Sequence, residues 1–284
     1  MDKYIINNEP GCTVTIMVPW DCDNGCPFCV NKCEYKPGFS VVASMAKILE
    51  NIAVMHEITP KCDFVITGGE PFADCSRLVD IIEAIPEGHP IYINTTLPVL
   101  YKYEIFEFVR KYWYKISGIN VSRHIWTPVD GANDKFIKKI GKYVSIRINS
   151  VILHYIRYSE KNEALFYDFL ERYEGFNIQI RSDYRNITIE DIADYELNSV
   201  YRFLKKCGAD CYDIRRETNR IGVKMECRGH NFTWHLTCDY SKVETTEGLE
   251  LVDIIINQKG ELMDDWNGYG ALLDLDVYKR SIEY

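Results

Sequence analysis

The sequence predicts an α/β fold, a partial (β/α)6 TIM-like barrel followed by a small β-rich C-terminal appendage. Two observations carry this prediction. Short apolar runs alternate with segments of helical periodicity six times before residue 207, as parallel strands covered by helices do. After Gly208 the alternation stops, and apolar runs separated by turns indicate strands alone. Six units are two short of a closed eight-stranded barrel, so we expect an open one.

The predicted elements divide the chain into a barrel over residues 1–207 and an extension over residues 208–284. Barrel strands are expected at residues 12–18, 63–67, 90–96, 116–122, 144–153 and 176–181. One helix is expected to begin after Ser40, a typical N-cap residue, and to continue to at least Met55. Further helices are expected at residues 76–85, 101–112, 131–143, 160–173 and 189–207. Extension strands are expected at residues 221–227, 232–237, 251–257 and 262–266. The extension is interpreted as a lid over the substrate or an auxiliary metal module.

Composition and charge argue against several classes of protein. The chain has 284 residues, of which 46% are hydrophobic and 26% charged, as in an ordinary globular protein. A formal net charge of −9 gives no broad basic surface for nucleic-acid phosphates. No apolar run reaches the roughly 18 residues of a membrane span, and residues 1–10 lack a signal-peptide core. The 11 cysteines are odd in number and three are clustered, so we expect a soluble protein of the reducing cytoplasm.

Three cysteines, Cys22, Cys26 and Cys29, follow the first predicted strand with the spacing C-x3-C-x2-C. The Asn-Gly and Cys-Pro pairs between them favour a tight loop, which brings thiolates together as an iron–sulfur centre requires. A closed structural zinc site normally uses four ligands, whereas a three-thiolate [4Fe–4S] cluster leaves one iron open. A zinc knuckle completed by Cys33 or a histidine is the less favoured alternative.

A second motif lies at residues 64–71, where a short β-run ends in Gly-Gly-Glu-Pro. With the aromatic Phe28 before the third cysteine, the two motifs resemble those of the radical S-adenosylmethionine (radical SAM) superfamily. The resemblance covers about residues 13–181 and also implies the open (β/α)6 barrel. It implies a [4Fe–4S] cluster on the three cysteines, with S-adenosyl-L-methionine (SAM) bound to the fourth iron. Reductive cleavage of SAM would give a 5′-deoxyadenosyl radical that abstracts hydrogen from a substrate.

The resemblance also implies which side chains surround SAM. Gly68 and Gly69 are expected to let the backbone approach the ligand, and Glu70 to offer its carboxylate or backbone to the methionine ammonium. The guanidinium of Arg123 suits a carboxylate, whereas His124 is interpreted as a satisfied loop histidine. The remaining cofactor-binding candidates are Phe28, Thr67, Asn94, Thr95, Ser122, Arg147, Asn149 and Arg181.

Two features leave alternatives open. At the end of the third strand the glycine that is usual in the superfamily is missing, because Leu97 follows, so a simple turn is as well supported as a ribose contact.

Four late cysteines are candidates for a second metal site, either iron–sulfur or zinc. Buried or free thiols are favoured for them, because no two of these four cysteines form a C-x2-C pair. These cysteines are Cys207, Cys211, Cys227 and Cys238.

We therefore predict a radical SAM enzyme that acts on a small-molecule or nucleotide-type substrate and receives electrons from a donor such as flavodoxin or ferredoxin. The acidic charge and the lack of a recognisable peptide-recognition domain favour this class of substrate. A peptide-modifying maturase is the alternative. A third hypothesis is a non-catalytic iron–sulfur or zinc binding protein, against which the intact Gly-Gly-Glu-Pro motif argues. No membrane or nucleic-acid partner is expected.

Overall fold

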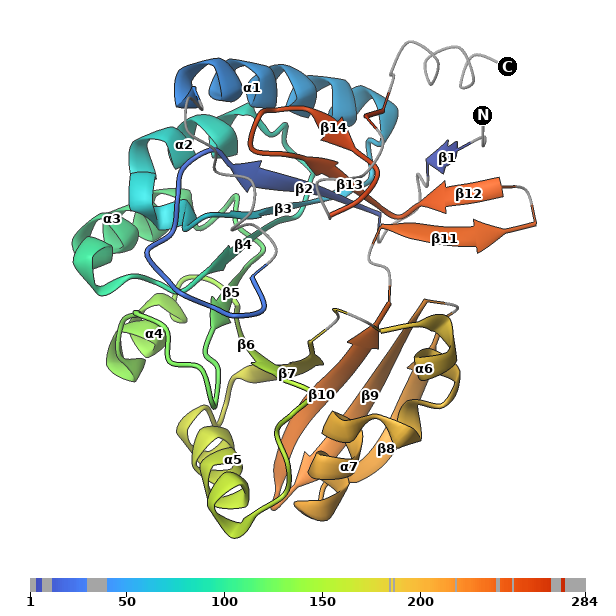
Figure 1. Ribbon diagram of the computed structural model, residues 1–284. Helices are drawn as coiled ribbons and strands as arrows, with labels where there is room; N and C mark the ends of the chain where they lie inside the picture. The colour runs from blue at the N-terminus through green and yellow to red at the C-terminus, as the bar shows by residue number, and fades with distance from the viewer. Residues whose placement is uncertain are drawn as a thin grey trace.

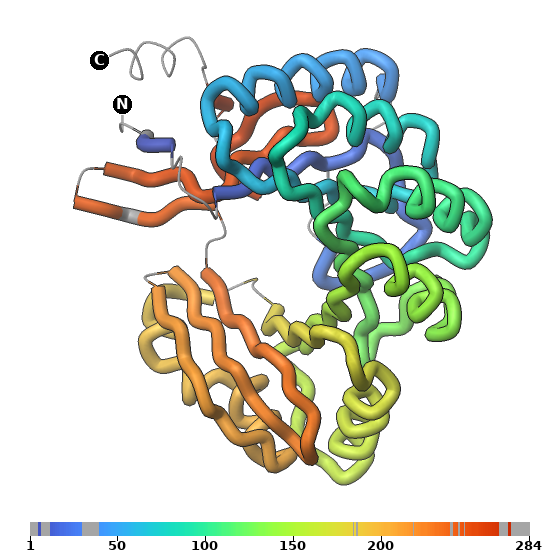
Figure 2. Tube along the Cα trace, turned by 180° about the vertical axis from the view of Figure 1, so that it is seen from behind, coloured from blue at the N-terminus to red at the C-terminus, as the bar shows by residue number. Residues whose placement is uncertain are grey.

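The chain forms a curved sheet with helices on its outer side, as the computed structural model shows (Figure 1). The structure describes residues 4–6, 12–29, 40–183, 185, 187–217, 219–238, 241–246, 248–266 and 272–273. Six parallel strands form the centre of the sheet: β2 (Thr13–Val18), β3 (Asp63–Gly68), β4 (Ile91–Thr95), β5 (Gly118–Ser122), β6 (Ile146–Ile152) and β7 (Asn177–Ser182). The helices between them are α1 (Val41–Ile58), α2 (Cys75–Ala84), α3 (Lys102–Tyr112), α4 (Asp134–Ile140) and α5 (Glu160–Arg172). Figure 2 shows these helices as an arc around the outside of the strands.

The C-terminal residues extend this sheet at both edges. The later strands are β8 (Asp210–Arg216), β9 (Arg220–Cys227), β10 (His230–Thr237), β11 (Lys242–Thr245), β12 (Gly248–Leu251), β13 (Asp253–Ile256) and β14 (Leu262–Met263). The order of the large sheet is β14-β13-β2-β3-β4-β5-β6-β7-β10-β9-β8, with β10 parallel to β7 and β13 parallel to β2. Residues on both sides of the predicted boundary at 207 therefore share one sheet. A short strand β1 (Tyr4–Ile6) joins β12 and β11 in a separate sheet.

The prediction of an α/β fold with parallel strands and outer helices is confirmed. In the part of the chain that the structure describes, the outermost strands β14 and β8 are not paired with each other. The barrel is therefore open, as expected from six units rather than eight. None of the described helices combines the length and the apolar character that a membrane crossing needs.

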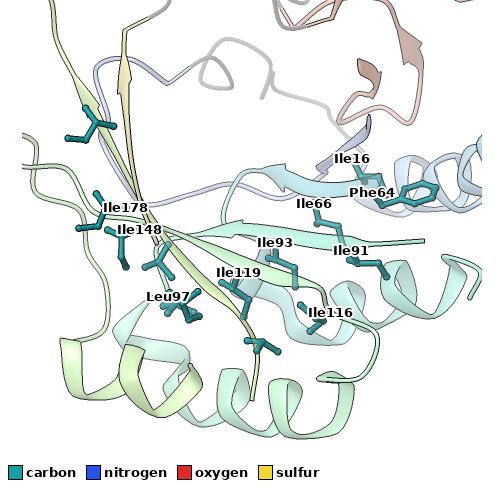
Figure 3. Packing of buried hydrophobic residues seen from close by; sticks show 14 of the residues in the cluster. Ile16, Phe64, Ile66, Ile91, Ile93, Leu97, Ile116, Ile119, Ile148 and Ile178 are labelled. Atoms are coloured by element: carbon teal, nitrogen blue, oxygen red, sulfur yellow. The ribbon is translucent and has the colours of Figure 1, made fainter. Parts of the chain in front are cut away.

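The two faces of the central strands differ in polarity. Ile16, Ile66, Ile93 and Ile119 are successive neighbours in the register of four strands, and each is fully buried on the helix side (Figure 3). Burial of each such side chain contributes about 1.5–3 kcal/mol. The opposite face carries polar residues such as Asn94, which is paired in register with Asn120. Because parallel strands are usually apolar on both faces, a polar inner face indicates a ligand site.

Three details of the element predictions are wrong. The single helix expected at residues 189–207 is broken into α6 (Ile189–Ala193), a 3-10 turn (Tyr195–Leu197) and α7 (Ser199–Lys206). The break occurs because the Asn198 side chain caps α7 by accepting backbone N–H groups. Strand β8 was not predicted, because its residues are mostly exposed and lack apolar alternation. The strand expected at residues 251–257 is divided, since Leu251 ends β12 and Asp253 begins β13.

Candidate active site at the carboxyl ends of the strands

A cavity of about 270 Å³ lies where the parallel strands end. Most of the predicted site residues line it: Cys22, Cys26, Phe28, Cys29, Thr67, Gly68, Gly69, Glu70, Asn94, Thr95, Ser122, Asn149 and Arg181. Arg123 and Arg147 do not line it. The structure thus brings the two sequence motifs to one cavity, as expected for loops at the carboxyl ends of barrel strands.

The cysteine loop begins directly after β2, and its three thiols are partly exposed toward the cavity. Burial raises the pKa of the Cys22 thiol, and two hydrogen bonds from Asn24 act in the opposite direction. The backbone N–H of Asn24 donates to Cys22 Sγ at 3.4 Å, and its side-chain amide donates at 3.7 Å. N–H donors stabilise a thiolate, which is the form that binds iron. The donor set therefore fits an iron–sulfur cluster.

Asn24 was missed by sequence reasoning, although it lies inside the cysteine motif. Its side-chain oxygen accepts the N–H of Asp130 at 2.7 Å, and its amide donates to the Thr96 hydroxyl at 3.5 Å. Asn24 thus connects the cysteine loop both to the end of β4 and to the segment before α4. A second unpredicted connection comes from Arg185, which pairs with Asp183 at 2.9 Å and donates to the Pro27 carbonyl at 2.7 Å.

The two glycines of the second motif are explained by close packing of the backbone. Gly68 has a φ of 104°, in the region that glycine adopts without strain. A Cβ added to Gly68 would lie 2.6 Å from the Val18 nitrogen, and one added to Gly69 would lie 1.9 Å from the Trp20 carbonyl oxygen. Both positions therefore press the end of β3 against the entry to the cysteine loop. This packing comes in addition to the expected approach to a ligand.

The Glu70 carboxylate is 4% exposed and accepts four hydrogen bonds. One oxygen accepts the Phe72 N–H at 3.1 Å and the Thr95 hydroxyl at 2.5 Å. The other accepts the N–H and the hydroxyl of Thr96, both at 2.9 Å. Burial raises the pKa of Glu70, and these hydrogen bonds oppose the rise. The carboxylate therefore fastens the end of β4 to the turn after β3.

The turn after β4 has a strained residue at the position where the superfamily usually has glycine. Leu97 has a φ of 49° and a fully buried side chain. A left-handed conformation costs a non-glycine residue about 1–2 kcal/mol. The Thr95 hydroxyl accepts the Leu97 N–H at 2.8 Å, and the Leu97 carbonyl accepts the N–H of Ala132. These bonds hold the conformation that a glycine would adopt freely.

Arg123 binds backbone carbonyls rather than facing the cavity. Its guanidinium donates to the carbonyl oxygens of Thr96 at 2.8 Å, Ser122 at 2.6 Å and Ala132 at 2.8 Å. Burial lowers the pKa of Arg123, and three carbonyl acceptors compensate the desolvated charge. These hydrogen bonds use the planar guanidinium of Arg123 to join the ends of β4 and β5. They do not show the interaction with a carboxylate that was expected for it.

His124 lines the cavity and connects the cysteine loop to β6. Its Nδ1 accepts the Val151 N–H at 3.0 Å, so we assign the ring proton to Nε2. Its ring meets the Phe28 ring edge-on, with centroids 4.6 Å apart. The interpretation of His124 as a satisfied loop histidine agrees with this hydrogen bond.

Acid is expected to destabilise the protein through His124. Burial, and then the charge of Arg123, lowers its pKa from 6.5 to about 4. The unfolded chain therefore binds more protons between these values, and stability present above pH 6.5 is lost as the pH falls toward 4, by about 3 kcal/mol at most. The His124→Asn variant keeps an acceptor for the Val151 N–H but does not titrate. Urea unfolding of the iron-free variant should show a flatter pH dependence than wild type; parallel curves would contradict this origin.

Comparison with known proteins finds solved structures with a similar fold. No family model and no curated protein matches the sequence. Among solved structures, SuiB from Streptococcus suis has a TM-score of 0.55 and 16% identity, covering 94% of this chain and 64% of SuiB. The structure of SuiB bound to its precursor peptide SuiA gives 0.53 and 15%, covering 94% of this chain and 63% of that one. The chain therefore shares the fold of SuiB.

The chain spans less than two thirds of the length of SuiB. BtrN, solved in complex with AdoMet and 2-DOIA, is a weaker likeness, with a TM-score of 0.32 and 17% identity over 50% of this chain and 58% of BtrN. At such identities the likeness concerns the fold. The roles of individual site residues remain predictions.

The candidate second metal site is not formed. Within the described ranges there is no group of three or more His, Cys, Asp or Glu side chains placed to hold a metal ion. Cys207 and Cys227 are buried together, where the Cys227 thiol donates to the Cys207 carbonyl at 3.2 Å. Cys238 lies at the other end of the β9–β10 hairpin, beside Asn219. The hairpin separates Cys238 from Cys227, so the four thiols cannot converge. Cys33 lies outside the described residues.

The three cysteines of the loop are arranged differently from the four late cysteines. They border one cavity without forming a cage for a single ion. Ligands of a [4Fe–4S] cluster bind different irons, so they do not need to converge on one point. Trp266, which belongs to the C-terminal extension, also lines this cavity, and its indole N–H donates to the Asp253 carboxylate at 2.9 Å.

Proposed function

We propose that the chain is a radical SAM enzyme whose Cys22, Cys26 and Cys29 hold a [4Fe–4S] cluster. The observation that carries the proposal is the meeting of the cysteine loop and the Gly-Gly-Glu-Pro turn at one cavity of the expected fold. When bound, the cluster supplies the electron that cleaves SAM into methionine and a 5′-deoxyadenosyl radical, which removes hydrogen from the substrate.

The residues of the chain would bind the cluster and SAM and orient them. Asn24 donates to the Cys22 sulfur, which favours its thiolate. Glu70 and Thr96 hold the loops after β3 and β4 in register with the cysteine loop. Polar side chains on the inner face, among them Asn94 and Asn149, offer hydrogen bonds to the ribose or carboxylate of SAM. Trp266 also lines the cavity.

Anaerobic reconstitution tests this function directly. We expect about four irons per chain, with the matching sulfide, and formation of 5′-deoxyadenosine after addition of SAM and dithionite. About eight irons would require a second cluster, which the described cysteines do not support. Bound zinc without iron, or iron without SAM cleavage, would instead favour a non-catalytic binding protein.

A peptide substrate is the second candidate, and one observation favours it. The fold matches SuiB, which was solved bound to its precursor peptide SuiA. A small-molecule or nucleotide-type substrate remains the first proposal, because the acidic chain shows no recognisable peptide-binding domain. Incubation with a short peptide encoded beside this gene, followed by mass spectrometry for a loss of hydrogen, distinguishes the two.

We also propose an electron donor of the flavodoxin or ferredoxin type and a reducing, cytoplasmic environment. Eight of the described cysteines are free, including the partly exposed Cys22 and Cys29 of the loop. Free, partly exposed thiols persist where glutathione and thioredoxin keep them reduced.

A further inference from the structure

The inner wall of the barrel beside the cavity holds two buried polar atoms that hydrogen bonds among the described residues do not satisfy. Arg147 and Asn149 lie on the same inner face of β6, since side chains alternate along a strand. The Arg147 Nε and the Asn149 Oδ1 are both buried without a hydrogen-bond partner in the described part of the chain. Orphaned polar atoms of this kind are rare in native proteins and call for an explanation.

Two neighbouring strands place further groups on the same wall. Arg181 of β7 is paired in register with Val151 of β6 and with His235 of β10. The Arg181 Nε donates to the Gln179 side chain at 3.0 Å, which keeps its guanidinium on the inner face and at the cavity. The inner face beside the cavity thus continues from β6 across β7 to β10.

Among the described residues, the charges that act on Arg147 and His235 come from arginines and from Tyr92. Burial, and then the charge of Arg181, lower the pKa of Arg147 to about 10, so Arg147 remains a cation at neutral pH. Burial and the charges of Arg181, Arg147 and Arg220 lower the pKa of His235 to about 4. Tyr92 is the one other titratable group that acts on Arg147, and no carboxylate of the described residues acts on either side chain. A buried cation without a counter-charge is costly.

We propose that Arg147, Arg181 and His235 form a binding site for an anionic group, a carboxylate or a phosphate, carried by the substrate. An anion would supply the acceptor that the Arg147 guanidinium lacks, and a planar fork suits both chemistries. The proposal rests on the proposed function for its reference to a substrate. The anion site itself is inferred from the structure and does not depend on that function.

The position of the wall argues against the carboxylate of SAM as its occupant. SAM is expected at the open iron beside the cysteine loop, which follows β2. Arg181 lines the same cavity as the cysteine loop, but neither Arg147 nor His235 lines it. Arg147 also lies nearer the start of β6 than Asn149, which lines the cavity. The wall is therefore placed for a second molecule.

Thermal unfolding with inorganic phosphate as the probe tests the site. At constant ionic strength, phosphate should raise the Tm of the wild-type protein saturably relative to chloride. In Arg147→Met the half-saturating phosphate concentration should rise at least about tenfold, as expected for loss of a charged hydrogen bond. In chloride the variant should melt at or above the wild-type Tm, because an uncompensated buried charge is gone.

Matched variants separate this role from a purely structural one. Arg147→Lys, which keeps the charge, should recover part of the phosphate response, and Arg110→Met, on the exposed surface of α3, should respond as wild type. A lower Tm of Arg147→Met in chloride, with an unchanged phosphate response, would show that Arg147 is structural and would overturn the proposal.

SAM cleavage without substrate distinguishes the two sources of an anion. On reconstituted protein, Arg147→Met should form 5′-deoxyadenosine with the wild-type half-saturating SAM concentration. A rise of about tenfold would assign Arg147 to the SAM carboxylate and would overturn the proposal. If wild type shows the phosphate response but never cleaves SAM, the anion site stands and the proposed function fails. If it cleaves SAM without any phosphate response, the anion site alone fails.

Discussion

Cys26→Ala is expected to lose the cluster and, with it, SAM cleavage. A [4Fe–4S] cluster held by three thiolates has no spare ligand, so removal of one leaves an iron without its protein bond. Loss of outer partners of a metal site already costs about 10–100-fold, so loss of a direct ligand should reduce 5′-deoxyadenosine formation by more than about 100-fold. Iron and sulfide analysis of the anaerobically reconstituted variant should show the same loss. Cys22→Ala and Cys29→Ala should behave alike.

The fold of these variants should survive, because the three thiols are partly exposed and outside the hydrophobic core. Far-ultraviolet circular dichroism and the urea midpoint of the iron-free protein check this. Cys211→Ala, which removes a similarly half-buried thiol of β8, is the matched control and should keep wild-type iron content and activity. Normal 5′-deoxyadenosine formation by Cys26→Ala would remove the cluster assignment.

The barrel can be predicted from the sequence because the outer face of its strands is regularly apolar. Ile16, Ile66 and Ile93 belong to short apolar runs, and each run is followed by a helical pattern. The strands at the open edges are harder to predict. β8 is mostly exposed and charged, so only its pairing with β9 defines it. Such tertiary pairing leaves no periodic signal in the sequence.

The site is predictable to the extent that its chemistry is local. The cysteine loop and the Gly-Gly-Glu-Pro turn are contiguous motifs, and both reach the predicted cavity. Asn24 carries no distinctive signal, because its importance arises from bonds to Asp130 and Thr96, which are distant in the sequence. Arg123 was assigned to a ligand because an arginine after a strand suits an anion. Only the three-dimensional structure shows that carbonyl oxygens surround it.

Glu70→Ala is expected to destabilise the iron-free protein by about 3–5 kcal/mol, although Glu70 lies in a ligand motif. The substitution leaves the buried N–H groups of Phe72 and Thr96 without acceptors. Glu70→Gln should cost about 1–3 kcal/mol, because its one carbonyl oxygen can accept only one of these two backbone donors. Urea unfolding at pH 7 measures both values, and the exposed Glu107→Gln is the control, with a change below about 0.5 kcal/mol.

A double-mutant cycle decides whether Glu70 positions the loops or binds the ligand alone. Thr96→Val keeps the backbone N–H but removes the hydroxyl that donates to Glu70 at 2.9 Å. If Glu70 acts through Thr96, the two substitutions should couple by about 0.5–3 kcal/mol in the free energy of unfolding. Both should also raise the half-saturating SAM concentration, because Thr96 joins Glu70 to Asn24 and so to the cysteine loop. Additive effects on stability, with a loss of SAM affinity confined to Glu70→Gln, would instead assign the carboxylate directly to SAM.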